Sequence, residues 1–114
     1  MEIKTFEEYQ YECAKTMGDH WDDMKLGLSY GTLGMVGEAG EVAEKVKKWL
    51  NNSKELDVDG IKKELGDVMW YIAALCEKLG FSMQEAAEIN IKKLRKRHGE
   101  SYSGFGDRSS EEAK

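Results

Sequence analysis

Apolar residues recur at steps of three and four along most of this chain, which is the spacing of one face of an α-helix. The clearest run lies between residues 57 and 79, where the steps alternate regularly through Ile61, Leu65, Val68, Ile72, Leu75 and Leu79. Gly80 follows this run directly, as glycine often does where a helix ends in a left-handed residue. We therefore predict a helix over about 57–79.

Two earlier helices are predicted from the same kind of pattern. Thr5 and Glu8 have the spacing of a capping box, which opens a first helix that is predicted to stop near Gly18. Residues 18–29 are interpreted as a polar connector. A second helix is predicted over about 29–50, with an apolar face made of Leu33, Val36, Val42, Val46 and Trp49.

A fourth helix and a tail complete the chain. Ser82 and Glu85 form a second capping box, and the helix they open is predicted to stop at Gly99. Residues 101–114 are rich in Ser, Gly and charge, which is typical of a loose tail or of an arm laid over a neighbour. We therefore expect one domain over 1–100 and a separate tail.

Composition agrees with an all-α fold. The 114 residues include no proline, the residue that damages helix interiors most, and 114 residues are enough for one domain. The expected architecture is a bundle of about four helices around a central antiparallel pair.

Charge and apolar content exclude several classes of function. A net charge of −5 argues against a protein that binds a nucleic acid polymer through a basic face. No run approaches the roughly 18 apolar residues of a membrane span. Cys13 and Cys76 sit within apolar helical patterns, so we expect two buried free thiols in a reducing, cytoplasmic setting.

A short acidic motif occurs once in each of the two middle helices. The sequence E-A-G-E-V contains Glu38 and Glu41, and E-L-G-D-V contains Glu64 and Asp67. At about 100° per residue, the two acids of a copy lie within about 60° of each other, at the border of the apolar stripe. If the two helices pack antiparallel, the acidic pairs converge on one spot.

Four carboxylates in one place repel one another unless a cation joins them. Oxygen ligands alone select a hard ion, so Mg²⁺ is expected, with Mn²⁺ as an alternative. Four acids exceed what one Mg²⁺ usually takes from a protein. The surplus suggests two ions, or one ion and a general base, as in phosphoryl chemistry. In an arbitrary acidic helix such residues only solvate a face, but repetition of the motif favours a site.

Glycine recurs at every third position of the second helix, at Gly31, Gly34, Gly37 and Gly40. Each costs up to about 1 kcal/mol relative to alanine in a helix interior. Close helix contact is the interpretation that we favour for Gly31 and Gly34. For Gly37 and Gly40, close contact and room for a ligand both stay open.

Further ligand contacts are suggested by the fourth helix and by aromatic residues. Asn90, Lys93 and Arg97 share one helical stripe and are suited to phosphate oxygens, although cations at a helix end often serve only to favour its dipole. Trp70 and Tyr71 are able to stack a nucleobase, yet aromatic residues beside an apolar stripe are more often core or interface.

The segments G-E-A-G-E-V-A-E, K-E-L-G-D-V-M-W-Y and N-I-K-K-L-R-K-R together resemble the MazG-like family of the all-α NTP pyrophosphohydrolase superfamily, whose signature is E-x-x-E followed by E-x-x-D. The resemblance covers about residues 25–105. It implies a helical bundle in which the four acids bind Mg²⁺, each serving as a metal ligand or as a general base. It also implies hydrolysis of a (deoxy)nucleoside triphosphate to the monophosphate and pyrophosphate.

The same resemblance implies that Asn90 and Lys93 contact the nucleotide, with Arg97 as a looser match, and that the chain assembles as a dimer or a dimer of dimers. Two other classes of function remain open. One is a catalytically silent helical module that binds a metal, and the other is a metal-dependent phosphohydrolase with a non-nucleotide substrate.

Overall fold

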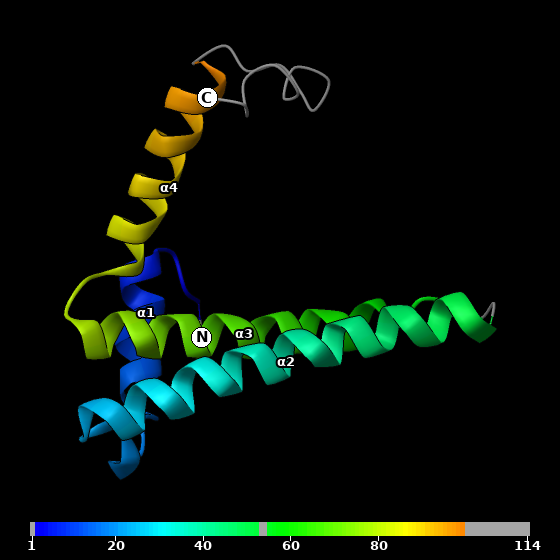
Figure 1. Cartoon of the computed structure of the whole chain (residues 1–114), viewed down its shortest axis with the longest axis horizontal. Helices are drawn as coiled ribbons and strands as arrows, with labels where there is room; N and C mark the ends of the chain where they lie inside the picture. The colour runs from blue at the N-terminus through cyan, green and yellow to red at the C-terminus, as the bar shows by residue number, and fades with distance from the viewer. Residues whose placement is uncertain (1, 53–54, 100–114) are drawn as a thin grey trace. The chain divides into compact units, whose positions relative to one another are not determined.

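The structure is a computed structural model that describes residues 2–52 and 55–99. Within these residues the chain is all-α and has no strand, which confirms the predicted class. The predicted tail, residues 101–114, lies outside the described residues. The described part of the chain forms four α-helices and one short 3₁₀ helix (Figure 1): α1 (Phe6–Ala14), η1 (Asp19–Trp21), α2 (Met24–Asn52), α3 (Val58–Leu79) and α4 (Met83–His98).

The first helix begins where its capping box predicts. The Thr5 hydroxyl oxygen accepts a hydrogen bond from the Glu8 backbone N–H at 3.0 Å, so one of the free amides at the start of α1 is satisfied. The helix ends at Ala14, a few residues before the predicted end.

The second helix begins at Met24, which corrects the predicted start near residue 29. The Asp23 carboxylate accepts a hydrogen bond from the Leu26 backbone N–H at 2.7 Å and acts as a cap. The predicted connector is therefore shorter. It holds η1, whose Trp21 is only 2% exposed.

The bounds of α3 and α4 agree with the prediction. Asp57 caps α3 by accepting a hydrogen bond from the Gly60 N–H at 2.9 Å. At its other end Gly80 has a φ of 85°, and its N–H donates to the Cys76 carbonyl. Gly99, with a φ of 84°, follows α4. Both glycines adopt the left-handed conformation that side chains disfavour.

The core lies between α1 and the second half of α3. Cys13 of α1 and Ala73 and Cys76 of α3 are buried there together with Met83, and Tyr9 packs on them. Both cysteines are free, as predicted. After Met83 the chain continues as a second compact unit that contains the rest of α4.

The most extensive helix packing in the first unit is between α2 and α3, which lie side by side (Figure 1). Gly31, in the first half of α2, lies against Leu75 near the end of α3. The ammonium of Lys45, in the second half of α2, lies 3.2 Å from the carboxylate of Asp57, the residue just before α3.

The predicted apolar face of α2 does not all reach the core. Leu33 is 73% exposed and Val36 is 66% exposed. The helix instead turns Gly27 and Gly31 inward, and both are buried against Trp21. Small residues let two backbones approach closely, so the glycine face makes the contact that the apolar face was expected to make.

Among the described helices, none combines the length and the apolar character that crossing a lipid bilayer requires.

Candidate metal centre

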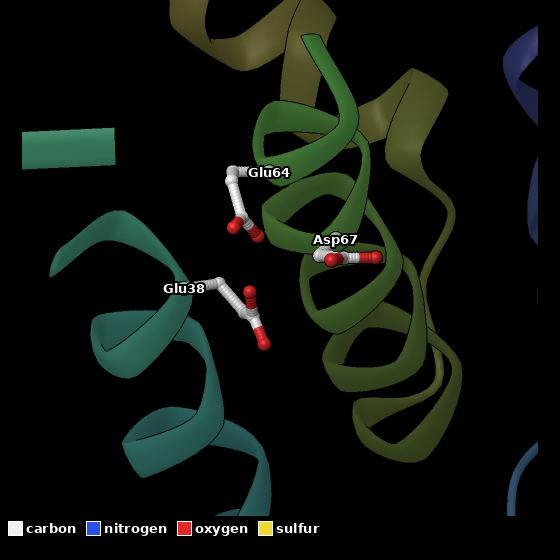
Figure 2. Close-up of side chains that lie close together, drawn as sticks. All are labelled: Glu38, Glu64 and Asp67. Carbon is white, nitrogen blue, oxygen red and sulfur yellow. The ribbon is translucent and has the colours of Figure 1, made fainter. Parts of the chain in front are cut away.

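Three carboxylates from two helices meet on one side of the α2–α3 pair. Glu38 of α2 and Glu64 and Asp67 of α3 each place one oxygen within 4.8 Å of the others. Figure 2 shows Glu38 reaching from α2 toward α3, where Glu64 points back at it. Glu38 and Glu64 are half-buried, and Asp67 is exposed.

Helix geometry places the two acids of α3. Glu64 and Asp67 are separated by three residues, so they stand on neighbouring turns of one face. Behind this turn, the Tyr9 hydroxyl of α1 donates a hydrogen bond to the Gly66 carbonyl at 3.4 Å. The Tyr9 phenol carries its proton at neutral pH, and burial raises its pKa further above the ordinary value. Helix α1 therefore supports the acidic turn from behind.

Glu41, the fourth acid of the sequence motif, stands one turn after Glu38 on α2. It is exposed and lies outside the group of three, although its charge still acts on Glu38. The structure thus brings together three of the four predicted ligands. Ligand or base roles for all four remain a prediction.

The electrostatics of the group favour a cation. Partial burial raises the pKa of Glu38, and a hydrogen bond with Glu64 and repulsion from Asp67, Glu64 and Glu41 raise it further. A bound divalent ion would remove this cost by neutralising the carboxylates. The donors are all oxygens, which fits a hard ion such as Mg²⁺ or Mn²⁺.

An aromatic ring stands one turn from the carboxylates on α3, and it contacts a second aromatic ring on α2. Tyr71 stands one turn after Asp67, and its hydroxyl is hydrogen-bonded to that of Tyr30. This bond, with burial, raises the pKa of Tyr71 to about 12. Tyr30 also stacks edge-on against His20 and Trp21. Tyr30 was not predicted as part of the site, and its position one turn before Gly34 was the available signal.

Trp70, a predicted substrate contact, is half-buried in the packing of the first unit. Its indole N–H donates to the Thr16 hydroxyl at 2.7 Å, and its ring lies 6.0 Å from that of Trp21. These contacts explain its position without a ligand. A role in stacking a base stays a prediction.

The other three predicted substrate contacts lie on α4. Asn90, Lys93 and Arg97 are all exposed there, in the unit that begins after Met83. Their predicted contacts with the nucleotide remain predictions.

The glycines of α2 divide as expected into two kinds. A methyl group on Gly31 would meet Trp21 and Leu75, and one on Gly34 would meet Tyr71. Close contact therefore explains these two. Around Gly37 and Gly40 no atom of the described residues lies within 4 Å of such a methyl group, so packing within the described part of the chain gives no reason for them.

Comparison with known proteins identifies relatives of this chain. The sequence profile described as "MazG nucleotide pyrophosphohydrolase domain" matches residues 30–101, a segment that contains the three clustered acids and Glu41. The chain is also 43% identical over 86 residues to a protein of Mycobacterium phage L5 named "Gene 37 protein", and the match covers 71% of this chain and 75% of the phage protein. No solved structure matches significantly.

Proposed function

The chain belongs to the MazG nucleotide pyrophosphohydrolase family, and from this membership we propose that it hydrolyses a (deoxy)nucleoside triphosphate, in the presence of Mg²⁺, to the monophosphate and pyrophosphate. The observation that carries the proposal is the meeting of Glu38, Glu64 and Asp67 across two helices. Carboxylates from separate elements repel each other, and a divalent cation offsets that repulsion.

In this proposal Glu38, Glu64 and Asp67 hold the ion, and Mn²⁺ is able to replace Mg²⁺. Bound there, the ion would neutralise the polyphosphate and lower the pKa of a water molecule. Glu41 is exposed one turn away, where it serves either as a further ligand or as the base that takes a proton from water.

Substrate contacts are proposed for residues outside the carboxylate group. Asn90 and Lys93 would bind phosphate or sugar oxygens, and Arg97 would add a second cation on the same stripe. Trp70 would face the base. We also propose that the protein works in the cytoplasm, where free thiols such as Cys13 and Cys76 persist.

The chain is further proposed to form a dimer or a dimer of dimers around the antiparallel α2–α3 pair. Among the described residues, few large apolar side chains are buried, so a single chain has a small core. Leu33 and Val36 of α2 and Leu65 of α3 are at least half exposed. Exposed apolar side chains on neighbouring helices are typical of a surface that another subunit covers.

Phosphorus NMR of reaction mixtures tests the proposed reaction. The protein is incubated with Mg²⁺ and each of a panel of standard and modified nucleoside triphosphates, with the Asp67→Asn variant as the control. We expect pyrophosphate and monophosphate from at least one substrate and none from the variant. Release of orthophosphate would contradict the reaction class. If no substrate reacts and a non-hydrolysable triphosphate shows no Mg²⁺-dependent binding, the chain is a silent module.

A further inference from the structure

Tyr71 of α3 lies directly on the backbone of α2 at Gly34. A methyl group at Gly34 would stand 2.8 Å from the Tyr71 hydroxyl oxygen, and nearer still to the ring atoms Cε1 and Cζ. Non-bonded carbon atoms prefer separations of about 3.5–4.0 Å. Only glycine therefore admits the Tyr71 ring at this point of the helix pair.

This contact lies one helical turn from the carboxylates in both helices. Gly34 precedes Glu38 by four residues, and Tyr71 follows Asp67 by four residues. One turn of helix advances about 5.4 Å, so a change of spacing at Gly34 is transmitted almost undiminished to Glu38.

The Tyr71 ring is held on its other sides as well. Its centroid lies 5.1 Å from the Trp70 ring, which is nearly perpendicular to it, and 5.9 Å from the Tyr30 ring. The hydroxyls of Tyr30 and Tyr71 are joined by a hydrogen bond. The ring consequently has little room to turn away if the backbone of α2 moves.

Nothing else described near the carboxylates fixes the helix spacing as tightly. A methyl group on Gly37 or Gly40 would meet no atom of residues 2–52 and 55–99 within 4 Å. Beyond the carboxylates, the Lys45–Asp57 ion pair joins the two helices, but Asp57 is exposed and such pairs hold geometry weakly. The Gly34–Tyr71 contact is thus the close packing nearest to the acids.

We propose that Gly34 and Tyr71 are positioning residues of the metal centre: the Tyr71 ring, seated on the bare backbone of Gly34, fixes the spacing and register that keep Glu38 opposite Glu64 and Asp67. Neither residue is proposed to touch the ion. The inference rests on the proposed function, because it assumes that the carboxylates bind a divalent cation.

A side chain at residue 34 has a defined consequence. The Gly34→Ala variant must move α2 away from α3 or displace the Tyr71 ring. Mg²⁺ demands near-ideal geometry with oxygens at about 2.0–2.1 Å, so a small displacement of Glu38 weakens binding. We expect Gly34→Ala to bind Mn²⁺ at least about tenfold more weakly. Gly37→Ala, the same change three residues away in open space, should keep wild-type affinity.

Paramagnetic resonance of free Mn²⁺, titrated against the full chain, measures this affinity without any need for turnover. Circular dichroism establishes that each variant remains helical.

Tyr71→Phe keeps the ring on Gly34 and should change the Mn²⁺ affinity less than threefold. The double variant Gly34→Ala with Tyr71→Leu should lose no more affinity than either single change, because the two residues act through one contact. In Mg²⁺-dependent turnover, Gly34→Ala should raise the Mg²⁺ concentration for half-maximal rate more than it lowers kcat.

The outcomes separate the inference from the proposed function. If the wild-type chain binds no Mn²⁺, the proposed metal centre itself fails. If the wild type binds and folded Gly34→Ala binds equally well, the positioning role is wrong. If Tyr71→Phe loses as much Mn²⁺ affinity as Gly34→Ala, the effect comes from the hydroxyl and the positioning role of the ring is also wrong. If Gly34→Ala does not fold, Tyr71→Leu alone decides: a folded variant with wild-type affinity contradicts the role.

Discussion

At the scale of single residues, the charge of Glu38 depends on what surrounds it. Partial burial, the hydrogen bond with Glu64 and neighbouring carboxylates raise its pKa. A proton therefore competes with a metal ion at a higher pH than for an ordinary glutamate, whose pKa is about 4.3. We expect Mg²⁺ affinity, measured by titration calorimetry, to fall on acidification through the raised pKa of Glu38. Affinity that stayed constant down to the ordinary glutamate pKa would contradict this.

The same raised pKa affects the stability of the metal-free protein with the opposite sign. The folded state holds its proton on Glu38 to a higher pH than the unfolded state does. The stabilisation that Glu38 contributes is therefore complete below its pKa in the unfolded state. It is lost as pH rises through the pKa of Glu38 in the folded state. Urea unfolding in a chelator should show that part of the stability falling across this window. Glu38→Gln should remove it, and an unchanged slope in that variant would contradict the assignment.

Substitution of the clustered acids tests their proposed role as ligands. Glu64→Gln and Asp67→Asn each remove one negative charge without changing the shape of the side chain. We expect either change to abolish measurable turnover and to leave the helical spectrum intact. Glu44→Gln, on the same helix as Glu38 but outside the cluster, is the matched control and should retain activity. Wild-type turnover in the Glu64 or Asp67 variant would refute the assignment.

At the scale of elements, the end of α3 depends on the backbone of one glycine. Gly80 has a φ of 85°, and none of the atoms that the structure describes lies within 4 Å of a methyl group placed on it. Gly80→Ala therefore adds backbone strain alone, and we expect a loss of about 1–2 kcal/mol of stability. Gly37→Ala should instead gain up to about 1 kcal/mol from helix propensity. Urea unfolding compares the two, and equal stability in both variants would contradict the left-handed cap.

Gln10 joins three elements of the first unit through its amide. Its nitrogen donates to the Glu77 carboxylate and to the Phe81 carbonyl, both at 3.1 Å, and its oxygen accepts from the Met83 N–H at 2.7 Å. Gln10→Ala leaves that N–H unsatisfied in a buried place, which costs about 1–3 kcal/mol. Urea unfolding of the variant measures the loss. An unchanged midpoint would mean that water replaces the amide.

The sequence predicts helices well where their ends carry recognisable chemistry. Gly80 and the regular apolar steps of α3 made that helix clear, and the capping box placed the start of α1. The start of α2 was misplaced because Asp23 lies in a run of polar residues, where a cap is hard to tell from a connector. Gln10 carried no signal at all, since its three partners become neighbours only in the folded chain.

At the scale of the whole molecule, the exposed apolar residues of α2 are the surface that the proposed assembly would cover. The Leu33 side chain is exposed in a single chain. Leu33→Glu would therefore leave a monomer stable, but it would disrupt an interface in which a second subunit covers this residue. Light scattering after size exclusion should give the wild type a mass of two or four times 13.0 kDa. Leu33→Glu should lower that mass. Thr32→Glu, the neighbouring exposed polar position, is the control. A wild-type chain of monomer mass would contradict the proposed assembly.

The site was partly predictable because its acidic residues follow a pattern within one chain. The assembly was not predictable in this way, because it depends on contacts between chains. The repeated acidic motif fixes which residues share a helix face, and the short link between α2 and α3 brings the faces together, so Glu38, Glu64 and Asp67 could be foreseen. The Gly34–Tyr71 contact could not, because the pattern of one helix does not state which ring of another rests on it. Which surface covers Leu33 is likewise a property of two chains.

The most direct test of the metal centre is anomalous diffraction from a crystal grown with Mn²⁺. We expect an anomalous peak bounded by carboxylate oxygens of Glu38, Glu64 and Asp67, at coordination distances of about 2.0–2.3 Å. Carboxylates that stand apart and face bulk water, with no peak between them, would contradict the central claim that two helices share one divalent ion.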